Sequence, residues 1–402
     1  MTRLLAFGDL HLDAGTQHRA DALADHEATL DRIHELVVEH DVDLVLFAGD
    51  AFHRPHASDR ARHVLHRFLA RLAGDGVPFV GVLGNASHDI YGTDRETALE
   101  LEHNPPAAYV SRYPEVIQVA GLSVCTLPST QVTRLVAAAN GGDRSAIYLQ
   151  AAERLVDTAR GLHACAERPA ILLGHWSVTG ASLPNGLPVD DLNEVVLPLD
   201  ALDRLGFDAI VLGHIHNPVM LPTRGTPGFY TGSPMTLDFG EAHVPHGVWI
   251  LDTDLLPDAG LAFEWVPLPQ RRFVTVDVDL MAAEAFALAQ TGEFDETDAI
   301  AGELDVAALD GAIVRVRYTA SEGQHLRVDQ GALRRLIADA GGRCYSIAPN
   351  IVREARRRAA EVDETLGPLE ALRAWCGSAS VIPGRWELLE AITRELLDEV
   401  AA

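Results

Sequence analysis

The sequence contains no lysine, so all 32 of its basic residues are arginine. They are outnumbered by 58 acidic residues, which gives a formal net charge of -26 at pH 7. Nucleic acids are polyanions, and proteins bind them through cationic surface. A protein of this charge is therefore not expected to bind duplex DNA through its overall electrostatic field. Such binding would require a local arginine cluster, metal ions or a basic partner.

Cysteines and long apolar runs are also scarce. The four cysteines, Cys125, Cys165, Cys344 and Cys376, lie far apart, which argues against a disulfide framework or a zinc ribbon and fits a cytoplasmic protein. No apolar stretch approaches the length of a membrane span, and the opening run Leu4–Phe7 is too short for a signal peptide. The hydrophobic fraction of 48% nevertheless suffices for a packed core, and a length of 402 residues favours two or three domains.

The first two-thirds of the sequence repeats one pattern. A short apolar run ends abruptly at small or polar residues that include Gly, Asp, Asn or His, as expected of buried strands. The runs are Leu4–Phe7, Leu44–Ala48, Phe79–Leu83, Ile171–Leu173 and Ile210–Leu212. Between the first three runs lie two helix faces, namely Leu30, Ile33, Leu36 and Val37, then Ala61, Val64, Leu65, Phe68, Leu69 and Leu72. Alternating strands and helices predict an α/β fold, in which ligands bind at the carboxyl ends of the strands.

Side chains that bind divalent metal ions occupy these strand ends. The candidates are Asp9, His11, Asp50, Asn85, His175, His214 and His216. Asp9 and His11 are alternate residues of an extended segment, so both can reach one ion, and the two oxygens of Asp50 can bridge two ions. Taken singly, an aspartate after a strand is usually a turn or cap residue, and a lone histidine is usually a surface residue. Their recurrence at five strand ends favours a site for two metal ions, with places left for water and substrate.

Such a site predicts hydrolysis of phosphate esters. Two ions about 4 Å apart polarise phosphoryl oxygens and lower the pKa of a bridging water, which attacks phosphorus. A nearby histidine can orient the phosphate or protonate the leaving oxygen, and His88 is the first candidate and His53 the second. Oxygen and imidazole ligands suit manganese, iron and zinc alike.

The character of the sequence changes around residues 267–272, where prolines and arginines indicate a linker. Beyond it, Phe273–Leu280 and Ile313–Tyr318 alternate like half-exposed strands, and a helix at Gly331–Ala340 and a run at Cys344–Ile351 follow. This region reads as a small α+β domain without a catalytic signature.

The end of the sequence is helical in pattern. One apolar stripe there is formed by Trp386, Leu389, Ile392, Leu396 and Val400. The stripe fits packing against the chain's own core and docking onto another protein equally well. We therefore predict a catalytic domain at 1–266, a capping domain at 270–350 and a helical partner-binding tail at 351–402.

Five short motifs resemble those of the calcineurin-like metallophosphoesterases: Gly8-Asp9-Leu10-His11, Gly49-Asp50, Gly84-Asn85, Gly174-His175 and Gly213-His214-Ile215-His216. Two further stretches resemble the SbcD-type DNA repair nucleases within that family, namely Gly49–Pro55, and Tyr230–Pro234 followed by Phe239-Gly240-Glu241. The resemblance covers residues 1–265 strongly and the rest only by layout. It implies a two-sheet sandwich with flanking helices, followed by a small α+β capping domain and a helical C-terminal tail.

The resemblance also implies roles for single residues. One ion, with manganese as the expected metal, would be held by Asp9, His11, Asp50 and His216, and the other by Asp50, Asn85, His175 and His214. His53 would lie near the phosphate, with Arg54 as a substrate-binding residue. The capping domain would help to position DNA, and the C-terminal helices would bind the coiled-coil base of an SMC-like ABC ATPase of the SbcC type. A homodimer is a further possibility, and no membrane is involved.

One motif departs from the family pattern. The family has His directly after the Asn of the third motif and then Asp, whereas Ala86-Ser87 intervene here before His88-Asp89. The insertion either bulges the loop and keeps His88 in place, or it removes the general acid, which typically costs about 10²–10⁴-fold in rate.

Three hypotheses therefore remain open. The first is a DNA nuclease, exonuclease or endonuclease, that acts in double-strand-break repair and recombination with an SMC-like ATPase. The second is a phosphodiesterase or phosphatase of small molecules, and the third is a metal-binding scaffold with little catalysis.

Overall fold

The computed structural model describes residues 2–15, 19, 21–85, 87–89, 108–129, 143–183, 186–189, 194–253, 263–290, 293–353, 366–378 and 385–401. The chain divides into two compact units. Unit 1 comprises Met1–Thr275, Asp305–Arg315 and Ile337–Ser346, and unit 2 comprises Val276–Leu304, Val316–Leu336 and Ile347–Ala402.

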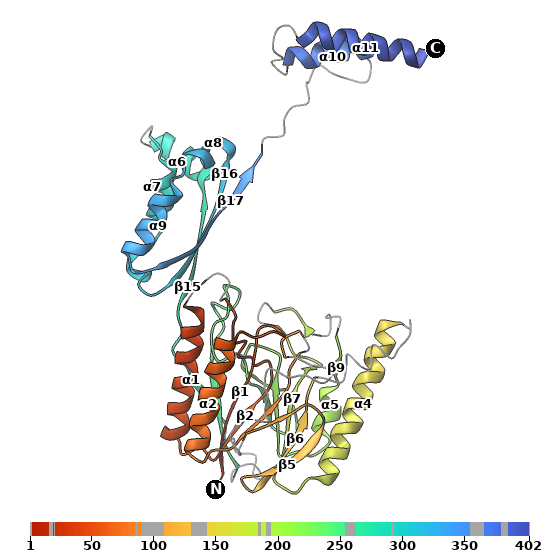
Figure 1. Cartoon of the computed structure of the whole chain (residues 1–402), viewed down its shortest axis with the longest axis vertical. Helices are drawn as coiled ribbons and strands as arrows, with labels where there is room; N and C mark the ends of the chain where they lie inside the picture. The colour runs from red at the N-terminus through yellow and green to blue at the C-terminus, as the bar shows by residue number, and fades with distance from the viewer. Residues whose placement is uncertain are drawn as a thin grey trace. The chain divides into compact units, whose positions relative to one another are not determined.

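Two six-stranded sheets form the body of unit 1 (Figure 1). The first sheet contains β1 (Arg3–Phe7), β2 (Leu44–Phe47), β3 (Phe79–Val82), β4 (Ala108–Ser111), β13 (Gly247–Asp252) and β14 (Phe263–Pro267), in the order β14-β13-β1-β2-β3-β4. The second contains β5 (Glu115–Val119), β6 (Leu122–Leu127), β7 (Ala170–His175), β10 (Ala209–Gly213), β11 (Val219–Met220) and β12 (Gly228–Tyr230), in the order β11-β12-β10-β7-β6-β5. A further pair, β8 (Ser177–Val178) and β9 (Val196–Leu197), is parallel.

The strands that carry the predicted ligands run parallel within each sheet. In the first sheet β1, β2, β3 and β4 are parallel neighbours. In the second sheet β6, β7, β10 and β12 are parallel neighbours. Because the carboxyl ends of parallel strands share one edge of a sheet, the polar residues that follow them gather at that edge.

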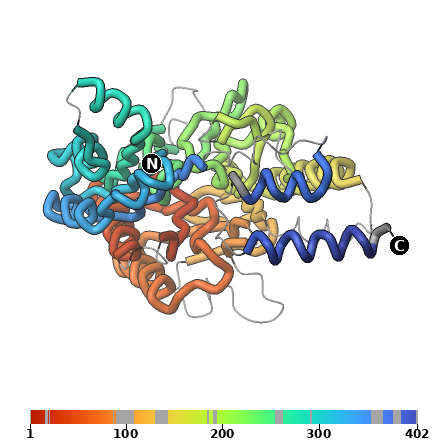
Figure 2. The backbone as a smooth tube through the Cα atoms, turned by 90° about the horizontal axis from the view of Figure 1, so that it is seen from above, coloured from red at the N-terminus to blue at the C-terminus, as the bar shows by residue number. Residues whose placement is uncertain are grey.

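Apolar side chains on both faces of the sheets hold the sandwich together. In β1, Leu4 and Ala6 belong to the core between the two sheets, whereas Leu5 and Phe7 face the helices. Strands buried on both faces read as continuous apolar runs, which explains the sequence pattern. Figure 2 shows the red and orange segments of unit 1 beside its yellow and green segments.

Helices cover the outer faces of the sandwich. The first sheet is covered by α1 (Ala22–Glu39) and α2 (Asp59–Gly74), and the second by α4 (Arg144–Cys165) and α5 (Leu199–Asp203) (Figure 1). Both predicted helix faces are confirmed, because their residues are the ones that α1 and α2 bury. Ser58 caps α2 by accepting from Ala61 N at 3.1 Å, and its own N–H and hydroxyl donate to Asp13 in the loop after β1. That contact ties the start of α2 to the predicted metal site.

A three-stranded sheet follows, in the order β15 (Phe273–Asp279), β16 (Ile313–Ser321) and β17 (Arg343–Val352). It is accompanied by α6 (Leu280–Gln290), α7 (Glu296–Gly302), a 3-10 turn (Val306–Ala308), α8 (Glu322–Arg327) and α9 (Gln330–Asp339). In β16, Val314, Val316 and Tyr318 are buried while Arg317 is exposed, so the predicted alternation is confirmed.

Two helices end the chain, α10 (Pro368–Ser378) and α11 (Arg385–Ala401). The guanidinium of Arg373 lies 5.4 Å from the ring centroid of Trp386, and its Nη2 lies 3.7 Å from Glu390 Oε1, so the two helices contact each other. Apolar side chains remain exposed on both, namely Trp375, Leu388, Ile392 and Leu396. Among the described helices, none is both long and apolar enough to cross a membrane.

The predicted fold class is confirmed: an α/β sandwich of two mixed six-stranded sheets, with an additional small sheet and C-terminal helices. The division into domains at 1–266, 270–350 and 351–402 stays a prediction.

Candidate metal centre

The predicted ligands of both sheets meet at one place in unit 1. His11 Nε2, after β1, lies 3.1 Å from His216 Nε2, after β10. His175 Nε2, at the end of β7, lies 3.3 Å from Asp50 Oδ2, after β2. Each of these contacts joins a residue of the first sheet to one of the second. The site therefore lies where the carboxyl ends of the parallel strands of the two sheets face each other.

Two longer contacts complete the cluster. His11 Nε2 lies 3.7 Å from Asp50 Oδ2, and His216 Nε2 lies 3.8 Å from Asp9 Oδ1. Among the predicted metal ligands, two groups have ligand atoms within 4.8 Å of one another, namely Asp9, His11 and His216, and Asp9, Asp50 and His175. Both groups contain Asp9, whereas the family resemblance assigns the shared role to Asp50. The division of ligands between two ions therefore stays a prediction.

Asn85 and His214 lie side by side in the cluster. Asn85 Nδ2 is 3.1 Å from His214 Nδ1, and Asn85 Oδ1 accepts from Ser129 Oγ at 3.4 Å. The prediction gave Asn85 a ligand role through its carbonyl oxygen. A half-turn of the amide would exchange the two atoms and direct Oδ1 to the site.

The ligand-bearing backbone is strained. Asp9, His11, Asp50 and His214 have φ of 50°, 47°, 55° and 93°, a region that non-glycine residues rarely adopt. Such strain persists only where surrounding contacts enforce it, and it is concentrated at functional sites. Here Asp9 N–H donates to Gly49 C=O at 2.9 Å and His11 N–H donates to Asp50 C=O at 3.0 Å. These bonds join the loop after β1 to the loop after β2.

Two of the glycines before the ligands are required by close approach. A Cβ on Gly84 would lie 2.1 Å from Asp50 Oδ1, and one on Gly213 would lie 2.2 Å from Ala48 C=O. Real Cβ atoms do not approach other atoms so closely, so only glycine fits at either position. The Gly-Asn and Gly-His pairs of the sequence thus have a packing cause.

The site is buried and its charges interact strongly. Burial raises the pKa of Asp9, although His175 and His216 act to lower it. Burial also acts to raise the pKa of Asp50, but His175 and His11 outweigh it and hold that pKa below its ordinary value. For His175 burial acts to lower the pKa, yet the carboxylates of Asp50 and Asp9 raise it to about 9. Buried carboxylates of this kind need positive charge beside them.

The donor atoms fit a divalent cation. His175 Nε2 and His11 Nδ1 are buried and have no aligned hydrogen-bond partner, which is costly for a polar atom unless it binds something. Carboxylate oxygens and imidazole nitrogens are ligands of manganese, iron and zinc. The metal-ligand assignments themselves stay predictions.

His88 and His53 lie beside His11. The ring centroid of His11 is 4.6 Å from that of His88 and 5.9 Å from that of His53. His88 Nδ1 contacts the carbonyl oxygen of His53 at 2.9 Å. Ligand atoms of the three histidines lie within 4.8 Å of one another. Arg54, the predicted substrate-binding residue, is exposed next to them.

Ser87 and His88, which follow Asn85 in the third motif, lie in a turn. The N–H groups of His88 and Asp89 donate to Asn85 C=O at 3.0 and 2.8 Å. Ala86 lies outside the described residues, and Ser87 is exposed. The turn returns His88 to the cluster, which favours the first of the two readings of the insertion.

Three carboxylates that sequence reasoning did not assign lie behind the predicted ligands. Asp89 is buried and accepts from backbone N–H groups of the two loops after β2 and β3. Glu194 contacts His214, and Glu241 contacts His216. Glu241 falls within the stretch Phe239-Gly240-Glu241 and Asp89 within the third motif, so sequence motifs could have indicated both residues. No motif contains Glu194.

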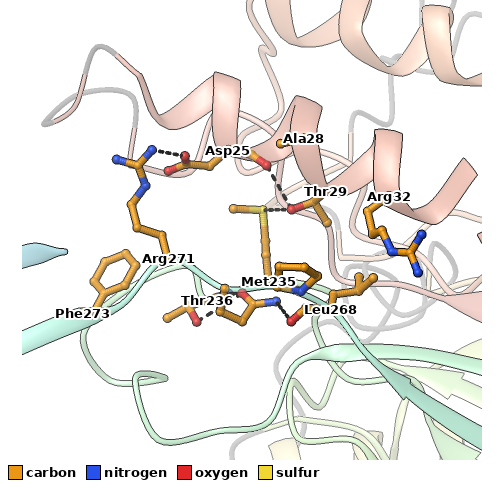
Figure 3. Close-up of a pocket in the computed structure, with 11 residues that line it drawn as sticks. Asp25, Ala28, Thr29, Arg32, Met235, Thr236, Leu268, Arg271 and Phe273 are labelled. Atoms are coloured by element: carbon orange, nitrogen blue, oxygen red, sulfur yellow. Dashed lines mark hydrogen bonds and ion pairs between the residues drawn. The ribbon is translucent and has the colours of Figure 1, made fainter. Parts of the chain in front are cut away.

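A separate pocket of about 300 Å³ lies beside α1 (Figure 3). It contains none of the predicted site residues. Arg271 donates to Asp25 at 2.7 Å, and the Thr29 hydroxyl donates to Met235 Sδ at 3.7 Å. These polar groups bond to one another, so the candidate functional site remains the histidine and carboxylate cluster.

This chain is similar in sequence to nuclease subunits and to a DNA repair protein. The SbcD component of the SbcCD nuclease from Escherichia coli K12 is 27% identical over 256 residues, which cover 60% of this chain and 62% of that protein. The DNA double-strand break repair protein Mre11 of Haloferax volcanii is 28% identical over 305 residues, 75% of this chain and 60% of that protein. The SbcD component from Bacillus subtilis is 26% identical over 270 residues, 62% of this chain and 66% of that protein. The chain thus spans less than two-thirds of each relative's length.

The calcineurin-like phosphoesterase family matches residues 2–218, more than half of the chain and all of the predicted metal ligands. The strand-end motifs and the cluster of donors all fall within this match. The chain therefore belongs to the calcineurin-like phosphoesterase family.

Proposed function

We propose that this protein is a metal-dependent DNA nuclease that hydrolyses phosphodiester bonds. One observation carries the proposal: oxygen and imidazole donors from both sheets converge, with His11 Nε2 and His216 Nε2 3.1 Å apart, in a chain of the phosphoesterase family. Seven donors are enough to hold two divalent ions, with manganese as the expected metal, and still leave positions for water and substrate.

The chemistry divides between the ions and the protein. When bound, two divalent ions would polarise the phosphoryl oxygens and generate a hydroxide nucleophile at neutral pH. Asp9 and Asp50 would hold them by charge, in a buried setting that strengthens the attraction. His53 and His88 lie at the side of His11, where one can orient the phosphate and the other can protonate the leaving oxygen.

Two features support DNA as the substrate. The stretches Gly49–Pro55 and Tyr230–Pro234 resemble those of SbcD-type DNA repair nucleases. The relatives are nuclease components and a double-strand break repair protein, at 26–28% identity. The same features support a role in double-strand-break repair and recombination, and the widely spaced cysteines support a cytoplasmic location.

The proposed partner is an SMC-like ATPase of the SbcC type. The exposed apolar side chains on α10 and α11, among them Trp375 and Ile392, would dock onto its coiled-coil base. A net charge of -26 weakens binding to DNA by the chain alone, and a partner with cationic surface would overcome this.

A second candidate is hydrolysis of small phosphodiesters, which the same net charge favours because such substrates need no extended cationic surface. An assay across metals separates the two functions. We expect Mn²⁺-dependent cutting of linear duplex DNA that increases with the ATPase, together with slow turnover of bis-p-nitrophenyl phosphate. Turnover of cyclic nucleotides without any cutting of DNA, with or without the ATPase, would establish the second candidate instead.

Asp50→Ala is the decisive variant, since Asp50 is buried and lies between His11 of the first sheet and His175 of the second. We expect it to abolish both metal binding in calorimetry and hydrolysis. Asp200→Ala, at an exposed aspartate of α5 paired with Arg204, is the matched control and should retain both. Retained Mn²⁺-dependent turnover in Asp50→Ala would refute the site.

A further inference from the structure

The two histidines of the Gly213–His216 motif turn different ring nitrogens toward the site. His214 directs Nδ1 inward, 3.1 Å from Asn85 Nδ2, and His216 directs Nε2 inward, 3.1 Å from His11 Nε2. Their other nitrogens face carboxylates: His214 Nε2 lies 3.1 Å from Glu194 Oε2, and His216 Nδ1 lies 2.5 Å from Glu241 Oε1. The two rings are therefore oriented oppositely toward the site, although only Ile215 separates them in the sequence.

Both carboxylates are themselves held in place. Glu241 Oε2 accepts from Leu237 N–H at 3.0 Å, and its side chain is only 12% exposed. Glu194 accepts from the hydroxyl of the buried Ser177, on β8. A carboxylate fixed by a second contact can define the orientation of the ring it meets, because its own rotation would break that contact.

The orientation determines which nitrogen can bind a cation. A neutral imidazole carries one N–H and one bare nitrogen, and a carboxylate accepts the N–H. The bare nitrogen is then Nδ1 in His214 and Nε2 in His216. The same arrangement occurs at His175, where Nδ1 faces Ala48 C=O at 2.7 Å and Nε2 faces the site, but there the acceptor is neutral.

We propose that Glu194 and Glu241 are positioning residues of the metal centre, which hold His214 with Nδ1 and His216 with Nε2 toward the ions. This inference rests on the metal site of the proposed function. Acceptors behind metal-bound histidines fix the ring and make it a stronger donor, and losing one typically weakens metal affinity about 10–100-fold.

Calorimetric titration of the full chain with Zn²⁺ and with Mn²⁺ tests the proposal. We expect about 10–100-fold weaker binding at the affected site in Glu241→Ala and in Glu194→Ala. Glu241→Gln should fall between Glu241→Ala and the parent, because an amide oxygen can accept the N–H but carries no charge. The control is Glu115→Gln, a glutamate of β5 that accepts from the buried Ser111 at 2.7 Å. It should bind metal like the parent.

Nitrogen NMR of the zinc-loaded chain, labelled at histidine, gives a readout that a purely structural role would not change. We expect His214 to be bound through Nδ1 and protonated at Nε2, and His216 to show the reverse. In Glu194→Ala the pattern of His214 should be lost while that of His216 remains. If the parent binds metal through the same nitrogen in both rings, or if both variants bind as tightly as the parent, the inference is wrong. If the parent binds no metal, the proposed function itself fails.

Discussion

The two sheets of unit 1 build their halves of the candidate metal centre by different means. The first sheet presents Asp9, His11 and Asp50 on backbone of positive φ, and it holds the loops by bonds between backbone groups. The second sheet presents His175 and His216 on ordinary backbone and holds their rings from behind by acceptors. His214 combines the two devices, with a φ of 93° and a carboxylate behind its ring.

The difference follows from the ligands themselves. An aspartate side chain is short, so its oxygen is placed mainly by the backbone, and the loop must be fixed. An imidazole is longer and can bind through either nitrogen, so its ring must be oriented as well. Substitutions in the first half should therefore change the shape of the loops. Substitutions in the second half should mainly change the orientation of the histidine rings.

Gly84→Ala should have the largest effect on the first half. The added Cβ would lie 2.1 Å from Asp50 Oδ1, and relieving that overlap requires movement of the ligand or its loop. We expect a loss of about 2–3 kcal/mol in the free energy of unfolding, as for an overpacked core, and loss of metal binding. Gly74→Ala, at the end of α2 with nothing within 4 Å, is the control. A Gly84→Ala variant with parental calorimetric and thermal behaviour would contradict the packing argument.

His88→Ala tests whether the first half also supplies proton transfer. If His88 protonates the leaving oxygen, kcat should fall about 100-fold or more while metal affinity stays the same. His53→Ala should lower activity less on a substrate with a good leaving group, such as bis-p-nitrophenyl phosphate, if its role is to orient the phosphate. Equal, small effects of both variants on kcat would assign neither residue to catalysis.

Asp89→Asn addresses the clamp between the two loops of the first half. Each Asp89 oxygen accepts two backbone N–H groups: Oδ2 from Gly84 and Asp50, and Oδ1 from Ala51 and Phe52, at 2.8–3.4 Å. In asparagine, one of these oxygens is replaced by an NH₂ group, which cannot accept and would face two backbone N–H donors. We therefore expect a loss of about 1–3 kcal/mol in unfolding free energy and weaker metal binding.

Asp208→Asn separates the two consequences of that change. Asp208 is also buried and accepts from Ala170 N–H at 2.7 Å and from Arg168, neither of which is a predicted ligand. The variant should lose stability with unchanged metal affinity. Weakened metal binding in both variants would indicate a general loss of structure rather than a clamp.

The smallest effect concerns His246, behind the second half. Burial lowers its pKa below the ordinary 6.5, although Ser233 C=O and Glu241 act to raise it. The folded state therefore favours the neutral ring, so its contribution to stability is full above pH 6.5 and is lost as the pH falls below that value. In His246→Gln, the unfolding free energy measured in urea should fall less as the pH drops below 6.5. His243→Gln, at an exposed histidine, is the control. The same pH dependence in His246→Gln as in the parent would contradict the assignment.

The sequence predicted the buried strands and the α/β fold class well, because these strands are buried on both faces and end at glycine. The two-sheet sandwich itself was implied by the family resemblance. The helix faces of α1 and α2 followed from apolar spacing for the same physical reason. The position of β13 could not be predicted, since it pairs with β1 across the chain, with Arg3 opposite Asp252. Pairing between distant segments depends on three-dimensional closure, and local patterns carry no record of it.

The site was predictable to a similar degree. Donors after strand ends were visible because each follows a short apolar run. Glu194 was not visible, because it stands alone in a loop and acquires its role only where β10 brings His214 to it. Nor can spacing tell which nitrogen a histidine turns inward. That choice depends on the acceptor behind the ring.

The bond from His214 N–H to Asp9 spans 205 positions of the chain, which sets a schedule for biosynthesis. At about 5–20 residues per second, roughly 10–40 seconds separate the synthesis of these two residues. All the predicted ligands are made before β13, which completes the first sheet between β1 and β14. The nascent chain thus carries Asp9 and Asp50 for many seconds before His175, His214 and His216 are made, so the predicted site cannot be complete until more than half of the chain has been synthesised.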